Sequence, residues 1–300
     1  MPTPPTNEKL VAAFPEVANL EEIARGGFKI VYDAQVNGQR EAFKLLALPA
    51  AAATETEKAY RQEYIGRAKR EIELLGKCAT PELVKLGSLV PREVTIDGVE
   101  YLGYSEEFLV GPSVQSLIGL PNPLPTEADI REMLISLLKA IKELWSFEVV
   151  HRDIKPLNII KVAQPGRPYV LLDLGIAYHT REPGLTIDPA NRFPPATIHY
   201  LAPEMLRANF RQALDFRSDI YTAGVSAFEY ATHQHPLKAT AEHPLRTISR
   251  VIRQNPTPLK SIRSDFSDAF CRLIDQMLKK SPPLRPGNLT ALIARLEAGQ

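Results

Sequence analysis

The sequence has few of the features that mark secreted, zinc-binding or membrane proteins. Its 300 residues include only two cysteines, Cys78 and Cys271, which lie far apart without zinc-ligand spacing. Positive and negative charges nearly cancel, 36 Lys and Arg against 35 Asp and Glu, so the basic excess typical of nucleic-acid binding is missing. The longest run of small apolar residues, 45–53, contains a proline and is far shorter than the about 20 residues of a membrane span.

The N-terminus also lacks a targeting signal. Residues 1–10, MPTPPTNEKL, contain no apolar core of a signal peptide. We therefore expect a soluble, cytoplasmic protein with no membrane span and no nucleic-acid partner. The length and the apolar fraction of 44% suit one large globular domain or two smaller ones.

One polar stretch organises the rest of the chain. It reads HRDIKPLN over residues 151–158, and Asp173-Leu174-Gly175 begins 15 residues after Asn158. Two short apolar runs between these motifs, separated by a Pro/Gly-rich segment, predict a β-hairpin. Such a hairpin brings Asp153, Asn158 and Asp173 toward one point. Phosphoryl transfer from a magnesium nucleotide needs groups of these kinds. One carboxylate can accept a proton, and an amide oxygen and a second carboxylate can bind hard cations.

These motifs resemble the catalytic loop and the metal-binding loop of protein kinases. Further family-like motifs follow in order on both sides, so the resemblance covers about residues 16–298. It implies a two-lobed α+β fold. The parts are a small antiparallel β N-lobe with one helix at about 16–106, a hinge at about 107–111 and a larger, mainly helical C-lobe at about 112–298. We expect residues 1–15 to be a loose segment.

The resemblance assigns a role to each residue of the central motif. Asp153 accepts or orients the proton of the substrate hydroxyl, and Lys155, a mark of Ser/Thr kinases, stabilises charge on the moving phosphoryl group. Asn158 and Asp173 hold Mg²⁺, with Mn²⁺ as the alternative metal. The implied reaction is transfer of the γ-phosphoryl group of ATP to Ser/Thr hydroxyls of proteins, autophosphorylation included.

The N-terminal motifs supply the nucleotide site that the resemblance implies. Lys44, inside an apolar run, would hold the phosphates and pair with Glu71, for which Glu63 and Glu73 are the alternatives. Glu106 falls at the position that guards the back of the nucleotide pocket, where an acidic residue is unusual. The other predicted ATP-binding residues are Ile23, Ala24, Gly26, Gly27, Val31, Ala42, Glu107 and Leu109.

The glycine-rich loop departs from the family pattern. Ala24 and Lys29 stand where the first and third glycines are expected, and Gly26 keeps the middle one. This departure supports one rival interpretation, a pseudokinase that acts as a nucleotide-binding scaffold or regulator. A small-molecule phosphotransferase is a second rival, although kinase-like enzymes of that kind usually lack the set of Lys155, Thr197 and the Ala-Pro-Glu motif found here.

Structural and regulatory residues complete the resemblance. Arg152 is the arginine that often binds a phosphorylated loop residue in this family. In the Ala-Pro-Glu motif, Glu204 would pair with Arg285. The remaining predicted residues are Asp219, which braces the catalytic-loop backbone, Thr197, which contacts the catalytic residues, and the phosphorylation candidates Thr180 and Thr186. The protein substrates stay unidentified, and a homodimer is the expected arrangement for autophosphorylation in trans.

Overall fold

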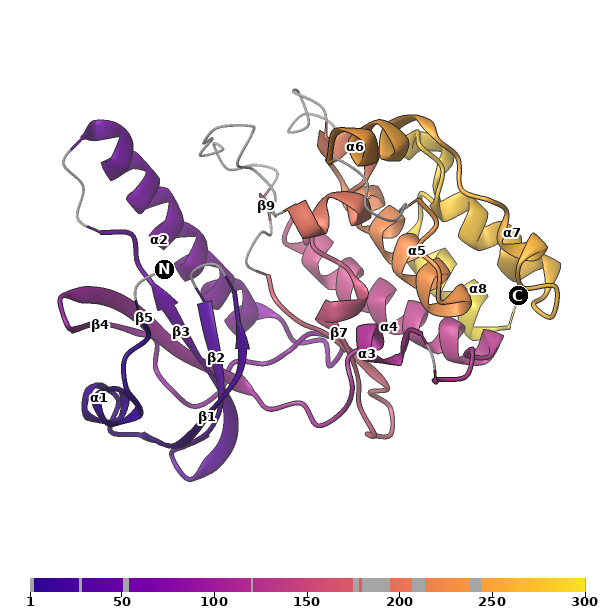
Figure 1. Ribbon diagram of the computed structural model, residues 1–300. Coiled ribbons are helices and arrows are strands. Elements are labelled where there is room, and N and C mark those ends of the chain that lie inside the picture. The colour runs from indigo at the N-terminus through magenta and orange to yellow at the C-terminus, as the bar shows by residue number, and fades with distance from the viewer. Residues whose placement is uncertain are drawn as a thin grey trace. The chain divides into compact units, whose positions relative to one another are not determined.

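A computed structural model describes residues 3–26, 29–50, 54–119, 121–174, 178–179, 195–206, 214–237 and 244–299 (Figure 1). The chain divides into two compact units. The N-terminal unit comprises Met1–Cys78 and Val84–Leu109, and the C-terminal unit comprises Ala79–Leu83 and Val110–Gln300. The division after Leu109 falls inside the stretch 107–111 that the sequence marks as a hinge.

The N-terminal unit is built on a five-stranded antiparallel sheet. In spatial order its strands are β1 (Val17–Arg25), β2 (Lys29–Val36), β3 (Gln39–Ala47), β5 (Val99–Glu107) and β4 (Arg92–Ile96). Asn37-Gly38 joins β2 to β3, and Asp97-Gly98 joins β4 to β5. All four turn residues have positive φ, the conformation that a two-residue type I′ hairpin turn requires.

Helix α2 (Glu55–Lys77) packs against this sheet. It begins at Thr54, whose side chain forms a reciprocal capping box with Glu57. Ala68 and Ile72 are buried with Leu102 of β5 and other residues of one hydrophobic cluster. The helix predicted over about 55–75 is therefore present, and it holds Glu71 on its buried side, 6% exposed.

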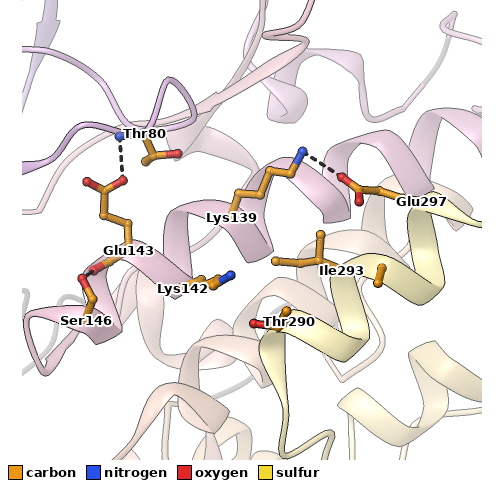
Figure 2. Close-up of a pocket in the computed structure, with 9 residues that line it drawn as sticks. Thr80, Lys139, Lys142, Glu143, Ser146, Thr290, Ile293 and Glu297 are labelled. Atoms are coloured by element: carbon orange, nitrogen blue, oxygen red, sulfur yellow. Dashed lines mark hydrogen bonds and ion pairs between the residues drawn. The ribbon is translucent and has the colours of Figure 1, made fainter.

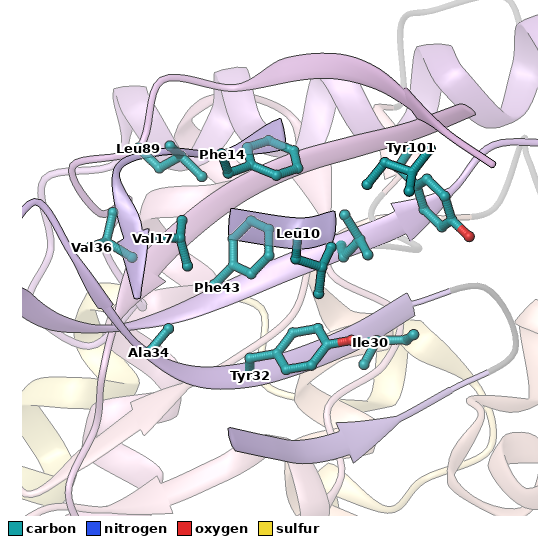
Figure 3. Close-up of a cluster of buried hydrophobic side chains, with 12 residues drawn as sticks. Leu10, Phe14, Val17, Ile30, Tyr32, Ala34, Val36, Phe43, Leu89 and Tyr101 are labelled. Atoms are coloured by element: carbon teal, nitrogen blue, oxygen red, sulfur yellow. The ribbon is translucent and has the colours of Figure 1, made fainter. Parts of the chain in front are cut away.

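The segment predicted to be loose contains a second helix, α1 (Asn7–Ala13), so that prediction is wrong. Thr6 caps the helix, and Leu10 and Phe14 are fully buried. Figure 3 shows both side chains in one hydrophobic cluster with Phe43 of β3. The Phe14 and Phe43 rings meet edge to face with centroids 5.1 Å apart. Two apolar residues four positions apart in a Pro/Thr-rich segment gave too short a pattern to predict this helix.

Successive residues of β3 and β5 point to opposite faces of the sheet, which divides the core of this unit. Phe43 and Tyr101 join the cluster under α1, whereas Leu46 and Leu102 join the cluster under α2. Glycine is required at position 103, because a Cβ there would collide with the Phe14 ring. Each face of the sheet thus has its own helix.

The C-terminal unit is mainly helical. Helix α4 (Glu127–Ser146) starts at the predicted capping box of Thr126 and Asp129 and packs on α5 (Phe216–Thr232) and α8 (Leu289–Glu297). Residues 218–232 of α5 are all buried, so this helix forms the centre of the unit. The other helices are α3 (Val114–Leu117), α6 (Pro244–Arg253), α7 (Asp268–Met277), and the short 3₁₀ helices η1 (Pro156–Asn158), η3 (Pro195–Tyr200), η4 (Pro203–Leu206), η6 (Leu259–Ser261) and η7 (Pro282–Leu284).

Two short antiparallel strand pairs lie in the C-terminal unit. The hairpin of β7 (Ile159–Lys161) and β8 (Tyr169–Leu171) confirms the one predicted from the sequence, and β6 (Val149–Val150) pairs with β9 (Tyr178–His179). The predicted α+β fold class, a small antiparallel sheet followed by a larger helical part, is confirmed, with two helices rather than one on the sheet. Within the residue ranges that the structure describes, no helix is long and apolar enough to cross a bilayer.

We predict that Phe14→Ala lowers the free energy of unfolding by about 3–5 kcal/mol, because it empties a fully enclosed aromatic site. Val11→Ala is the matched control, since Val11 lies on the same helix but is 40% exposed. Urea unfolding of the two variants checks the prediction. Equal, small effects of both substitutions would show that α1 contributes nothing to the sheet.

Candidate functional site

The stretch 151–158 is held in place by a buried carboxylate of α5. Asp219, which is fully buried, accepts hydrogen bonds from the backbone N–H groups of His151 (2.8 Å) and Arg152 (2.9 Å). Arg152 adopts φ 71°, so the chain turns sharply directly before Asp153. Burial raises the pKa of Asp219 to about 7, while its two backbone donors act in the opposite direction. Asp219 therefore fixes the start of the loop that carries the predicted catalytic residues.

Asp153, Lys155 and Asn158 form one hydrogen-bonded cluster. The Lys155 Nζ atom lies 2.9 and 2.8 Å from the two carboxylate oxygens of Asp153. Asn158 donates through Nδ2 to the Asp153 carboxylate (2.9 Å) and to the Asp153 carbonyl oxygen (3.0 Å). Burial raises the pKa of Asp153, and the nearby charge of Lys155 counteracts that shift. The cluster presents a carboxylate, a cation and an amide oxygen at one place.

The β7–β8 hairpin brings Asp173 to the same end of the unit as Asn158. Ile159 pairs with Leu171, and the N–H of Leu172 donates to the Asn158 carbonyl oxygen at 2.8 Å. Asp173 follows directly with φ 65°, a left-handed conformation uncommon for a residue with a side chain. Its negative charge raises the pKa of Asp153, although less than burial does.

His151 links the loop to the hairpin. Its ring is fully buried, its Nδ1 accepts from the Asp153 N–H at 3.2 Å, and its Nε2 lies 3.2 Å from the Leu172 carbonyl oxygen. Since a backbone N–H must donate to Nδ1, the neutral tautomer with hydrogen on Nε2 satisfies both contacts. Burial lowers the pKa of His151 to about 4, so the ring stays neutral near pH 7.

Asn158 and Asp173 offer the donor set that a hard cation prefers. Magnesium is commonly bound by one or two carboxylate or amide oxygens together with substrate phosphates. In the described ranges, no group of three or more His, Cys, Asp and Glu side chains gathers as a metal site. The two residues fit a cation shared with a phosphorylated ligand, and they do not fit a metal held by protein alone.

Lys44 has an unexpected partner in the N-terminal unit. Its Nζ lies 2.5 Å from the Glu106 carboxylate, and both side chains are almost completely buried. Glu71, the predicted partner, is also buried, and the Tyr104 hydroxyl lies 3.5 Å from its Oε1. Sequence reasoning noted Glu106 as unusual but did not predict this ion pair. The sequence feature that could have indicated this pair is Glu106 itself, an acidic residue near the end of the buried strand β5, which pairs with β3.

The other predicted nucleotide-binding residues lie on the first strands and near the end of β5. Ala24 of β1 pairs with Val31 of β2, and the Gly26 N–H donates to the Lys29 carbonyl oxygen at 2.8 Å, closing the hairpin. Gly27 lies outside the described residues. The remaining ones are placed as follows: Ile23 is half exposed on β1, Ala42 is half-buried on β3, and Glu107 and Leu109 are half-buried at the end of this unit.

The structure brings Glu204 and Arg285 together, as the sequence pairing expects. Two guanidinium nitrogens of Arg285 lie 2.6 and 2.8 Å from the two Glu204 carboxylate oxygens, and both residues are 2% exposed. Arg285 also donates to the Lys279 and Arg217 carbonyl oxygens, so its fork is well satisfied. Thr197 lies on η3 in this unit. Thr180 and Thr186 fall outside the described residues.

A separate cavity of about 530 Å³ lies between α4 and α8 and contains none of the predicted site residues (Figure 2). Three of its charged side chains contact neighbouring parts of the fold. Glu143 accepts from the Thr80 N–H at 2.6 Å, and Lys139 forms a 2.9 Å ion pair with Glu297. The Lys139–Glu297 pair joins the two helices across the cavity.

Comparisons with known proteins agree with the motifs. Residues 17–295 match the protein kinase domain family. The chain is 30% identical to the Arabidopsis thaliana protein "Serine/threonine-protein kinase 1" over 89% of this chain and 29% of that protein. It is 28% identical to serine/threonine-protein kinase dst1 of Dictyostelium discoideum (89% and 32% covered) and 28% identical to serine/threonine-protein kinase pkn3 of Myxococcus xanthus (78% and 42% covered). The chain thus spans less than half the length of these relatives.

We predict that Arg285→Met lowers the free energy of unfolding by about 3–5 kcal/mol, because Glu204 is left buried without its cation. Glu297→Gln is the control, since its pair with Lys139 is solvent-exposed and should contribute less than about 1 kcal/mol. Denaturant unfolding measures both. A loss for Arg285→Met no greater than that of the control would contradict the assigned anchoring role.

The pKa of His151 predicts a pH-dependent term in stability. Its folded pKa of about 4 lies below its usual 6.5, so between these values the unfolded chain binds more protons. Stability from this residue is therefore present above pH 6.5 and lost as the pH falls toward 4, by up to about 3 kcal/mol. The difference in unfolding free energy between wild type and His151→Asn should shrink over this window. A difference independent of pH would show that the ring is not held neutral.

Proposed function

This chain belongs to the protein kinase family, and from that premise we propose that it transfers the γ-phosphoryl group of ATP to Ser/Thr hydroxyls of protein substrates. The observation that carries the proposal is the hydrogen-bonded cluster of Asp153, Lys155 and Asn158. A binding module needs no carboxylate, cation and amide arranged in this way. Phosphoryl transfer needs these groups, because its catalysis consists mostly of positioning and charge stabilisation.

Asp153 would orient the substrate hydroxyl and receive its proton. Its carboxylate is 14% exposed and already held by Lys155 and Asn158, so it is fixed before a substrate arrives. Burial raises the pKa of Asp153, which brings it closer to the working pH at which a general base is most effective. Lys155 would stabilise negative charge on the transferred group while it keeps Asp153 in place.

Asn158, Asp173 and Lys44 would hold the magnesium nucleotide. Magnesium bound to the phosphates offsets their negative charge and so lowers the repulsion of an incoming hydroxyl. Asn158 supplies an amide oxygen and Asp173 a carboxylate, and Lys44 supplies a cation for the phosphates. The β1–β2 hairpin with Gly26 lets the backbone approach the phosphates closely, and Glu107 and Leu109 offer backbone groups to the adenine.

We further propose that the protein phosphorylates itself in trans, with Thr180 or Thr186 as the acceptor. Arg152, with its backbone fixed by Asp219, would then receive the phosphorylated loop residue. The rival function, a pseudokinase scaffold, draws on two observations: Ala24 and Lys29 replace glycines of the loop, and Lys44 pairs with Glu106.

We predict that incubation of the wild-type protein with Mg-ATP and a mixed peptide pool gives phosphate-sized mass gains on the protein or on Ser/Thr peptides. Asp153→Asn removes the base and should slow the transfer by about 10²–10⁴-fold. Asp268→Asn is the matched control, because Asp268 lies on α7 in an exposed ion pair with Lys260, and it should behave as wild type. Intact-mass spectrometry measures all three proteins. Nucleotide binding without any mass gain in wild type would favour the pseudokinase.

A further inference from the structure

A buried lysine contacts the carboxylate at the end of β5, and strand register explains why. Ala42 of β3 lies opposite Glu106 of β5, and Lys44 lies opposite Tyr104. Because residues two apart on a strand share a face, Lys44 and Glu106 are diagonal neighbours on one side of the sheet. Their side chains are 6% and 2% exposed, and 2.5 Å separates Nζ from Oε1. The strand register therefore places the two side chains within reach of each other.

A second carboxylate lies within the same cluster. The Tyr104 hydroxyl is 3.5 Å from Oε1 of Glu71, and the Lys44 ammonium lies 5.7 Å from the centroid of the Tyr104 ring. Tyr104 and Glu71 are both buried. Tyr104 therefore lies next to both the lysine and Glu71.

The charges of this cluster favour a lysine with two alternative partners. Lys44, Glu71 and Glu106 together contribute one positive and two negative groups to a buried region. A buried carboxylate is costly unless a cation or hydrogen-bond donors satisfy it, and the Lys44 ammonium is the cation that satisfies Glu106. An ammonium has three donors and can bind a carboxylate and a phosphate together. A phosphate that binds Lys44 therefore shares its ammonium with the negatively charged Glu106.

We propose that Glu106 is a positioning residue that holds Lys44 in the nucleotide-free protein, competes with nucleotide phosphates for it, and passes the lysine to Glu71 when a nucleotide binds. This inference rests on the proposed function, because it assigns Lys44 to the phosphates. The apparent dissociation constant of a ligand rises as the fraction of binding-competent protein falls. If Lys44 is released from Glu106 in about one molecule in ten, neutralising Glu106 tightens nucleotide binding by up to about tenfold.

The test is a binding titration with Mg²⁺ and a non-hydrolysable ATP analogue. Glu106→Gln keeps the shape of the side chain and removes its charge, and its dissociation constant should fall by about 3–10-fold. Glu71→Gln removes the receiving carboxylate and should weaken binding by a similar factor. Glu297→Gln, the same exchange in the exposed 2.9 Å pair with Lys139, should leave the constant unchanged. Unchanged or weaker binding by Glu106→Gln would overturn the proposal, since a merely structural glutamate cannot oppose the ligand.

Melting of the nucleotide-free protein separates this inference from the proposed function. With Glu71 able to receive the lysine, Glu106→Gln and Glu106→Leu should both fold, with melting temperatures near that of wild type. Lys44→Met should melt much lower, because it leaves the buried Glu106 carboxylate without its cation, and Lys44→Met/Glu106→Leu should recover part of the loss. If neither Glu106 variant folds, Glu106 is a fixed anchor and the proposal fails. If wild type binds no nucleotide, the proposed function fails. The Lys44–Glu106 pair of the nucleotide-free protein is still supported if double-mutant cycles of unfolding give a larger interaction energy for Lys44 with Glu106 than for Lys44 with Glu71.

Discussion

The hydrogen bonds that Asp219 accepts from two backbone N–H groups are the interaction on which the candidate site most depends. They come from His151 and Arg152, the residues that lead into Asp153. Burial makes charge costly for Asp219, and the two donors offset part of that cost. A loop with positive φ at Arg152 would not keep its shape without such an anchor, since strained backbone persists only where the surroundings determine it.

Each unit also contains a buried ion pair, and the two pairs differ in how completely the cation is bound. Glu204 and Arg285 form a bidentate pair with further carbonyl acceptors for the guanidinium, so that pair is saturated and suited to anchoring. Lys44 and Glu106 meet through one short contact, with Glu71 close by through Tyr104. An ammonium held by one carboxylate oxygen suits exchange better than a bidentate guanidinium pair does, which is why we assign the two pairs different roles.

Sequence reasoning succeeded where the relevant contacts are local. Asp153, Asn158 and Asp173 could be placed together because one hairpin separates them, and Pro/Gly punctuation marks that hairpin clearly. It failed for α1, whose stability comes from Phe14 packing on Phe43, a tertiary contact that no local pattern encodes. The partner of Lys44 was missed for the same reason, because the choice between two glutamates depends on strand register.

The central claim is that Asp219 positions the loop to which we assign phosphoryl transfer. The most direct test compares the rate of phosphate transfer from Mg-ATP and the affinity for a non-hydrolysable ATP analogue in wild type and Asp219→Asn. Asparagine keeps one acceptor oxygen but turns an N–H₂ group toward the second donor. We predict a transfer rate lower by about 10²-fold or more with nucleotide affinity within about twofold, because misplaced catalytic groups slow chemistry without weakening binding. An unchanged rate in a folded Asp219→Asn protein would contradict the account.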